Sequence, residues 1–356
     1  MHRAKNLLPE VVDFANLYQA FQAAGSGKRD RREVQIFEHD LETKLWEIHR
    51  EVSAGSYRWG EFRRFLISDP KRRQTKAAPF RDRVLHHALF NVINPILRRG
   101  FIADTYACIG GRGTHRAVNR FHSFVHARNG SGYALHGDIH SYFASVDHEI
   151  LMALLRRRIG DGALLRLLGS LVAHGAEAPG KGMPIGNLTS QLFANLYLDP
   201  LDHFVKEGLR IRYYLRYMDD FILVVGDRLE GRFALRRIAG FLDAALALGL
   251  NRRRVVLAPL SAPQDVLGYV HFADGHRRVR RRSVRRLWRR LPRLDARLAS
   301  GELTWEFVRA SIGSWFGLAR HADAYRLSTA IFTQRDVRNL GKRLLVADGA
   351  TVAWRT

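Results

Sequence analysis

The sequence predicts an α+β fold in which helices surround a small sheet that carries acidic residues. Between residues 8 and 55, apolar side chains recur every three or four positions, which is typical of helices buried along one face. The runs 211–215 and 221–225 are rich in β-branched and aromatic residues and predict two short strands. Residues 277–293 hold ten Arg and no acidic residue, with apolar side chains at helical spacing. We therefore expect helices at both ends of the chain and a sheet between them.

The N-terminal part is expected to be mostly helical. Gly25–Gly27 separate two helices, and a strand over 65–73 runs into a basic turn. A further helix opens at Phe80, and the glycine-rich loop 105–114 leads into another. A later helix is expected over 192–205, where apolar side chains again recur at helical spacing.

Asp219 and Asp220 lie between the two predicted strands, at the tip of a tight hairpin. Adjacent carboxylates repel each other and lose hydration there, and a bound divalent cation is the usual reason for such an arrangement. An Asx-type turn that only caps the hairpin explains these two residues alone equally well. Asp138 changes this balance because it closes a short apolar stretch that can lie beside the hairpin. The three carboxylates can form an all-oxygen site for two Mg²⁺ ions and in-line attack of a hydroxyl on a phosphate.

These residues resemble the catalytic blocks of the reverse transcriptases. Asp138 matches the first block of the palm, and Tyr217-Met218-Asp219-Asp220 matches the aspartate-pair block. The resemblance covers roughly residues 16–327. It implies a right-hand polymerase with α/β fingers, a palm whose antiparallel sheet carries the catalytic aspartates, and a helical thumb.

The resemblance also implies a division of the chain. N-terminal helices and fingers are expected over 1–130, and the palm over 131–272 with a helical insertion at 151–184. The Arg-rich thumb is expected over 273–356. No zinc-binding, HNH endonuclease or RNase H pattern follows, which argues against a complete group II intron protein.

The implied chemistry is RNA-directed DNA synthesis. Asp138 and Asp219 would hold two Mg²⁺ ions, with Asp220 as support and the backbone carbonyl of Ile139 as a further ligand. Mn²⁺ can substitute for Mg²⁺. The primer 3′-hydroxyl would attack the α-phosphate of a deoxynucleotide, and pyrophosphate would leave.

Basic residues of the predicted fingers match positions that clasp the incoming triphosphate or the template in the retron, group II intron and diversity-generating branch. They are Lys71, Arg73 and Arg112. Lys and Arg on flexible backbone suit phosphate in any case, although a solvated basic loop is the simpler reading for each residue alone. Arg83, which follows Asp82, can equally form a buried salt bridge with it.

The segment before the helix at 192–205 indicates the subfamily. Ile185-Gly186 and Ser190-Gln191 resemble the reverse transcriptases of diversity-generating retroelements. An apolar side chain at 185 cannot hydrogen-bond the nascent base pair, so the check on pairing should weaken. In that family the outcome is misincorporation opposite template adenine, which the resemblance implies here. The alternative is that Ile185 only packs against the fingers.

Phe143 lies where reverse transcriptases place an aromatic ring against the sugar of the incoming nucleotide. A ring at that place would clash with a 2′-hydroxyl and select deoxynucleotides. Phe143, Ile185 and Gln191 therefore complete the expected nucleotide and template pocket.

Composition agrees with a nucleic-acid partner. The 356 residues carry a formal charge of +24, and such a surface attracts polyanions. One Cys excludes an internal disulfide framework. With no signal-peptide core and no long apolar run, a soluble cytoplasmic protein with no membrane contact is expected.

The expected partners are template RNA, the primer or cDNA strand and dNTPs. The diversity-generating branch further implies a small basic accessory protein that forms a pentamer. Two alternatives stay open. One is a defence-associated bacterial reverse transcriptase with the same chemistry, and the other is a catalytically idle, maturase-like RNA-binding scaffold.

Overall fold

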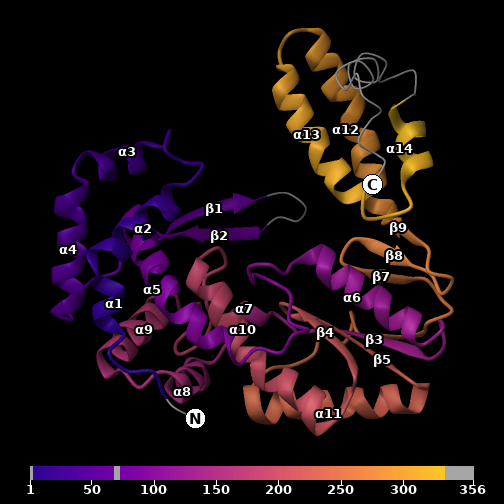
Figure 1. Ribbon diagram of the computed structural model, residues 1–356, viewed down its shortest axis with the longest axis horizontal. Coiled ribbons are helices and arrows are strands. Elements are labelled where there is room, and N and C mark those ends of the chain that lie inside the picture. Colours follow the sequence, from indigo (N-terminus) through magenta and orange to yellow (C-terminus); the bar gives the residue numbers. More distant parts are fainter. Residues whose placement is uncertain (1–2, 68–72, 333–356) are drawn as a thin grey trace. The chain divides into compact units, whose positions relative to one another are not determined.

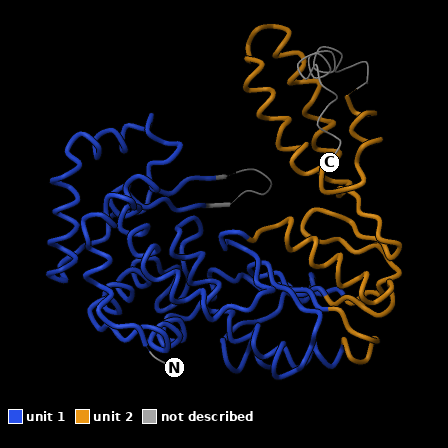
Figure 2. The backbone as a smooth tube through the Cα atoms, viewed as in Figure 1, with its two compact units in different colours: residues 1–111, 136–223, 232–256 blue, residues 112–135, 224–231, 257–356 orange. Residues whose placement is uncertain are grey.

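The computed structural model describes residues 3–67 and 73–332. By its internal contacts the chain divides into two compact units, and each is described by itself (Figure 2). Unit 1 comprises Met1–Gly111, His136–Leu223 and Arg232–Val256, and unit 2 comprises Arg112–Leu135, Val224–Gly231 and Leu257–Thr356.

Unit 1 begins with a group of helices, as the apolar spacing predicts. They are α1 (Leu8–Val12), α2 (Phe14–Gly25), α3 (Arg32–His39), α4 (Leu41–Ser53) and α5 (Phe80–Arg98). Aromatic rings join three of them, since Phe21 stacks on Phe37 at 5.8 Å between centroids and Phe37 meets Phe80 edge-on at 5.2 Å. The three-to-four-residue spacing is what brings these rings to one side of each helix.

A two-stranded antiparallel hairpin extends from this helical group (Figure 1). It pairs β1 (Arg63–Ile67) with β2 (Arg73–Ala77), from Arg63 opposite Ala77 to Ile67 opposite Arg73. The first strand was expected, but the second was not. The Arg-Gln-Thr-Lys-Ala sequence of β2 has no apolar run, and pairing with β1 decides its conformation.

The middle of unit 1 is helical. It contains α7 (Tyr142–Ser145), α8 (His148–Arg158), α9 (Gly162–His174), α10 (Leu188–His203) and a single π-turn, η1 (Phe204–Gly208). The prediction that α10 begins at residue 192 is wrong by four positions. Asn187 occupies the N-cap position, so Gln191 lies in the first turn of the helix and not in the preceding loop.

A four-stranded sheet carries the acidic residues. Its order is β4 (Tyr213–Tyr217), β5 (Asp220–Val225), β3 (Tyr133–Asp138) and β6 (Val256–Pro259), and α11 (Arg228–Leu246) follows β5. β4 and β5 are joined by two residues, which makes them antiparallel neighbours. At Gly137 on β3, a Cβ atom would lie 2.1 Å from the ring of Phe221. Only glycine therefore permits this contact between β3 and β5.

Unit 2 combines a small sheet with helices. Its elements are α6 (Thr114–Ala127), the antiparallel strands β7 (Gln264–Val266), β8 (Tyr269–His271) and β9 (Arg277–Val279), and α12 (Arg281–Ala299), α13 (Trp305–Ala319) and α14 (Tyr325–Phe332). Their common core includes Tyr269, Leu291, Ile312 and Trp315.

The Arg-rich segment is a helix, α12, from Arg281 onward. Leu287, Leu291 and Leu294 turn inward, and nearly all the Arg side chains around them are exposed. Trp288 is one of the apolar residues at helical spacing in this segment, and the spacing predicts that it is buried, but its side chain is 45% exposed. No helix in the described part of the chain combines the length and the apolarity that a bilayer crossing requires.

Candidate active site

The aspartate pair lies where the sequence predicts it. β4 ends at Tyr217, Met218 and Asp219 form the turn, and Asp220 opens β5. Met218 adopts the left-handed conformation, with φ at 58°, which is unusual for a side chain of this size. The carbonyl of Asp219 accepts a hydrogen bond from the N–H of Ile139, at 3.3 Å. This bond joins the turn to the residue that follows Asp138.

Asp138 closes β3, the strand beside β5, and is 5% exposed. Two side chains hold its carboxylate. Asn251 donates from Nδ2 to Oδ2 at 2.8 Å, and Arg254 donates from Nη1 to Oδ1 at 2.7 Å. The N–H of Asn251 also donates to the Asp138 carbonyl, at 2.8 Å. Asp138 is thus fixed through both its side chain and its backbone.

The three carboxylates interact with one another. Loss of solvent, the charge of Asp219 and a hydrogen bond with Asp138 raise the pKa of Asp220 to about 7, and Arg254 acts in the opposite direction. The clustered negative charge of Asp219 and Asp138 is thus part of the cause. A divalent cation relieves that repulsion, and carboxylate oxygens are the ligands that Mg²⁺ prefers. The donor set therefore fits a divalent ion.

Arg254 supplies a positive charge next to the carboxylates of this site. The bond to Asp138 raises its pKa above the ordinary value, and its side chain is 52% exposed. Within residues 3–67 and 73–332, no three His, Cys, Asp or Glu side chains are grouped so that they hold a metal ion as they stand. In this structure the Oδ1 atom of Asp138 accepts its hydrogen bond from Arg254.

A buried ion pair lies beneath the turn and was not predicted. The side chains of Arg216 and Asp202 are both 0% exposed and share two bonds of 2.7 Å. A third guanidinium nitrogen, Nη1, donates to the Met218 carbonyl at 2.9 Å. The sequence does hold a signal for this pair. Arg216 lies within an apolar strand and Asp202 within an apolar helix, and buried charges are normally paired.

Two of the residues expected to contact the incoming nucleotide, Phe143 and Ile185, lie on backbone segments that are hydrogen-bonded to each other. Phe143 lies in α7, and its carbonyl accepts a hydrogen bond from the Met183 N–H at 2.8 Å. Ile185 follows two residues later and is 41% exposed. A Cβ on Gly186 would lie 3.3 Å from a methyl carbon of Thr75, so this loop runs against β2. Gln191 is half-buried in the first turn of α10.

Of the basic residues expected to contact the triphosphate or the template, only Arg73 and Arg112 lie within the described part of the chain. Lys71 lies outside the described residues, and Arg73 is the first residue of β2. Arg112 is half-buried in the turn before α6, in unit 2. The pairing of Arg83 with Asp82 is wrong, because Arg83 pairs with Glu33. Asp82 instead accepts hydrogen bonds from the Tyr57 hydroxyl at 2.7 Å and the Gly60 N–H at 2.8 Å.

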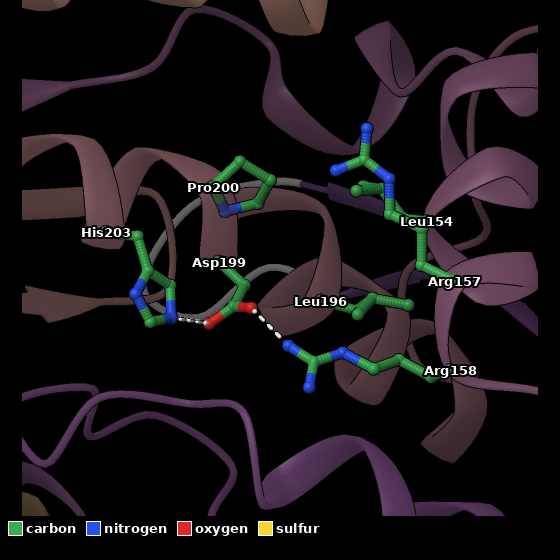
Figure 3. A pocket seen from close by; sticks show the side chains of 7 residues that line it. All are labelled: Leu154, Arg157, Arg158, Leu196, Asp199, Pro200 and His203. Carbon is green, nitrogen blue, oxygen red and sulfur yellow. Dashed lines mark hydrogen bonds and ion pairs between the residues drawn. The ribbon is translucent and has the colours of Figure 1, made fainter. Parts of the chain in front are cut away.

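A pocket of about 290 Å³ lies elsewhere in unit 1, between α8 and α10 (Figure 3). Asp199 stands between His203, with Oδ1 3.5 Å from Nε2, and Arg158, with Oδ2 3.4 Å from Nη2. Burial raises the pKa of Asp199 to about 6, against the opposing charges of His203 and Arg158. This carboxylate already has cationic partners, and its contact with Arg158 links α10 to α8. We therefore infer that its role is structural.

Comparison with known families identifies the family of the chain. The reverse transcriptase (RNA-dependent DNA polymerase) family matches residues 68–253, a range that contains Asp138, Asp219 and Asp220. The chain belongs to the reverse transcriptase family. This membership confirms the expected α+β polymerase fold class and an RNA-directed DNA polymerase. Reverse transcriptases use divalent metal ions and act on template RNA, a primer and dNTPs.

Two relatives show how far the similarity reaches. Protein YkfC of Escherichia coli K12 is 26% identical over 68% of this chain and 73% of its own length. The group II intron-encoded protein LtrA of Lactococcus lactis is 25% identical over 75% of this chain but 46% of its own length. A structure of Candida albicans telomerase, in complex with a fragment of telomeric RNA, aligns with a TM-score of 0.46 and 11% identity over 66% of this chain and 51% of that one.

Proposed function

We propose that this reverse transcriptase copies RNA into DNA by nucleotidyl transfer at Asp138, Asp219 and Asp220. The observation that carries the proposal is the convergence of these carboxylates from β3 and the β4–β5 turn, reflected in the raised pKa of Asp220. Two bound divalent ions would neutralise the phosphate and lower the pKa of the primer hydroxyl. Asp138 and Asp219 would hold them, Asp220 would support them and the Ile139 carbonyl would be a further ligand.

The chain itself supplies positioning and charge. Asn251 orients Asp138 through two hydrogen bonds, which leaves Oδ1 as the oxygen that Arg254 and a cation share. Arg254, once released, carries a permanent charge on an exposed side chain near the carboxylates. A guanidinium of this kind neutralises pyrophosphate well and donates protons poorly. The role we propose for Arg254 is therefore to neutralise the charge of the pyrophosphate product, and not to act as an acid catalyst.

Sulfur substitution at the α-phosphate tests the metal-dependent step. With an α-thio dNTP that directs sulfur toward the metal, we expect extension on RNA to slow at least about tenfold in Mg²⁺ and to recover in Mn²⁺, which accepts sulfur more readily. Equal slowing in both metals would contradict direct contact between the metal and the α-phosphate. The other thio isomer, which directs sulfur away, serves as the control.

The enzyme further belongs, in our proposal, to a diversity-generating retroelement and misincorporates opposite template adenine. Ile185 supports this because it is 41% exposed on a loop tied to Phe143 through Met183. An exposed apolar side chain beside the nascent pair excludes water without offering a hydrogen bond. Gln191 lies in the first turn of α10 and not in the loop that carries Ile185.

Sequencing of RNA-templated products tests this role. We expect errors to concentrate opposite adenine in the wild type and to fall several-fold in Ile185→Gln, which restores a hydrogen-bonding group. Leu188→Gln, a matched change in the same segment, should leave the error spectrum unchanged. Faithful copying by the wild type with its cognate RNA would contradict the diversity-generating role and leave the polymerase intact.

A defence-associated reverse transcriptase would share this chemistry, and a neighbouring variable gene with near-repeat sequences would argue for the diversity-generating role instead. The proposed partners are a template RNA and a pentameric basic accessory protein. An idle maturase-like scaffold is disfavoured because all three carboxylates are retained and converge.

A further inference from the structure

The Tyr217–Asp220 turn has an unusual support on its inner side. Arg216 directs every nitrogen of its guanidinium at a partner inside unit 1, although its side chain is 0% exposed. Nε and Nη2 donate to the two oxygens of Asp202, each at 2.7 Å. Nη1 donates to the Asn195 side-chain oxygen at 3.2 Å and to the Met218 carbonyl at 2.9 Å. The guanidinium thus connects α10 to the backbone of the turn.

Each oxygen of the Asp202 carboxylate accepts a further hydrogen bond. Oδ1 also accepts from the Tyr214 hydroxyl at 2.7 Å, and Oδ2 from the Thr105 hydroxyl at 2.8 Å. Burial acts against the charge on Arg216, but Asp202 beside it raises the pKa of Arg216 above its ordinary value. Arg216 therefore keeps its charge beside Asp202, and the ion pair of the two balances that charge within the fold. It adds little net charge beneath the carboxylates, in contrast to Arg254.

The turn needs such a support. Met218 has φ at 58°, a left-handed conformation that a residue with a Cβ adopts only when its surroundings enforce it. Its carbonyl is the group that Arg216 holds, and the next carbonyl, that of Asp219, is held by the Ile139 N–H. Two consecutive peptide groups are thereby fixed on either side of the first metal-binding carboxylate of the pair.

We propose that Arg216, clamped by Asp202, is a positioning residue that holds the Met218 carbonyl and so fixes the left-handed turn that presents Asp219 and Asp220 to the divalent ions. The inference rests on the proposed two-metal function of these carboxylates. Arg is required because three nitrogens act at once, two on Asp202 and one on the turn, and Lys has a single nitrogen.

The test uses the full chain and a double variant, Arg216→Met/Asp202→Asn. Removing both charges avoids a buried unpaired ion, and Asn keeps hydrogen-bonding groups for Tyr214 and Thr105. Tyr57→Phe is the matched control, because it removes a different buried hydrogen bond of unit 1, the one to Asp82. Mn²⁺ affinity measured by electron paramagnetic resonance, without any substrate, is the primary readout. All proteins are compared well below their unfolding temperatures.

We expect the double variant to bind Mn²⁺ about tenfold more weakly and to lose about tenfold or more in kcat, with the KM for primer–template unchanged. Tyr57→Phe should lower thermal stability and leave Mn²⁺ affinity and kcat as in the wild type. Adding Met218→Gly to the double variant should recover part of the Mn²⁺ affinity, because glycine adopts the left-handed turn without strain.

Wild-type Mn²⁺ affinity and kcat in the double variant would overturn the positioning role while leaving the polymerase proposal in place. The same holds if Tyr57→Phe weakens Mn²⁺ binding equally, because general destabilisation would then explain both variants. A wild type that binds Mn²⁺ in an Asp219-dependent way yet extends no primer with its cognate RNA would instead contradict the proposed function.

Discussion

At the scale of single residues, Asp138 has two competing cationic partners. Oδ1 accepts from Arg254 at 2.7 Å, and the same oxygen is expected to bind a divalent ion. A charge-assisted hydrogen bond is stronger than a neutral one, so it opposes binding of an ion at the same oxygen. We therefore expect Arg254 to compete with a divalent ion for this oxygen and to orient the carboxylate while no ion is bound.

Removal of this competitor should strengthen metal binding. We expect Arg254→Ala to raise Mn²⁺ affinity in the absence of substrate by roughly fivefold, the order expected for loss of one charge-assisted hydrogen bond at an exposed group. Its kcat should fall, because pyrophosphate loses a positive neighbour. Arg253→Ala is the control, since it changes the net charge equally from an exposed neighbouring position. Equal effects of both changes would mean that only overall charge matters.

His86 makes the stability of unit 1 sensitive to acid. It is 2% exposed, Nε2 has no hydrogen-bond partner, and burial together with nearby His87, His174 and Arg83 lowers its pKa to about 3. Between pH 6.5 and 3 the unfolded chain binds a proton at this residue that the folded chain does not. Its contribution to stability is therefore fully present above pH 6.5 and is lost as the pH falls toward 3.

Urea unfolding at pH 7 and pH 5 tests this linkage. His86 should account for a loss of about 2 kcal/mol over that interval, from the difference between an ordinary His pKa and one near 3. His86→Phe keeps an aromatic ring near Trp59 but cannot titrate, so it should show a correspondingly smaller loss. A loss in His86→Phe as large as that of the wild type would exclude His86 as the cause.

At the scale of elements, the contact between β3 and β5 determines how the carboxylates meet. Gly137 precedes Asp138, and its missing side chain is replaced by the Phe221 ring, one residue after Asp220. We expect Gly137→Ala to cost about 1–3 kcal/mol of stability through overpacking and to reduce polymerase activity as the strands separate. Gly240→Ala on α11 meets nothing within 4 Å and should be neutral or slightly stabilising. Comparable losses in both variants, by thermal unfolding and extension assays, would contradict this account.

Elements defined by their own pattern were predictable, and those defined by distant partners were not. The β4–β5 turn and α12 follow from apolar runs and spacing, and Asp138, Asp219 and Asp220 follow from their places at strand ends. β2 has no such pattern, and Trp288 obeys the helical period while pointing outward. Asn251 and Asp202 join the site, and Arg254 meets Asp138, only through tertiary contacts more than ten residues distant, which no local pattern encodes.

At the scale of the whole molecule, a formal charge of +24 favours a polyanionic partner. α12 concentrates this charge, because its leucines are buried in the core of unit 2 and its Arg side chains surround them. We therefore expect α12 to contact the phosphates of the template–primer duplex without reading sequence. The domain boundaries expected from the sequence, with the thumb over 273–356, stay a prediction.

Salt-dependent binding to an RNA–DNA duplex tests this surface. Changing the exposed Arg282, Arg285 and Arg289 to Gln should reduce the slope of log affinity against log salt by about 2–3, since each lost phosphate contact contributes roughly 0.7–0.9. The control changes three exposed Arg of α11, Arg232, Arg236 and Arg237, and removes the same charge. If both triple variants bind alike, net charge rather than α12 explains the affinity.

The most direct test of the central claim is extension of a DNA primer on an RNA template with Mg²⁺ and dNTPs, with the cognate RNA and accessory protein supplied. The wild type is compared with Asp219→Asn/Asp220→Asn, and duplex binding is measured in parallel. We predict that the wild type makes cDNA, and that the variant binds the duplex as tightly but extends it at least about 1,000-fold more slowly, because its metal ligands are lost. Undiminished extension by the variant, or a wild type that binds the duplex and adds no nucleotide, would contradict catalysis at these carboxylates.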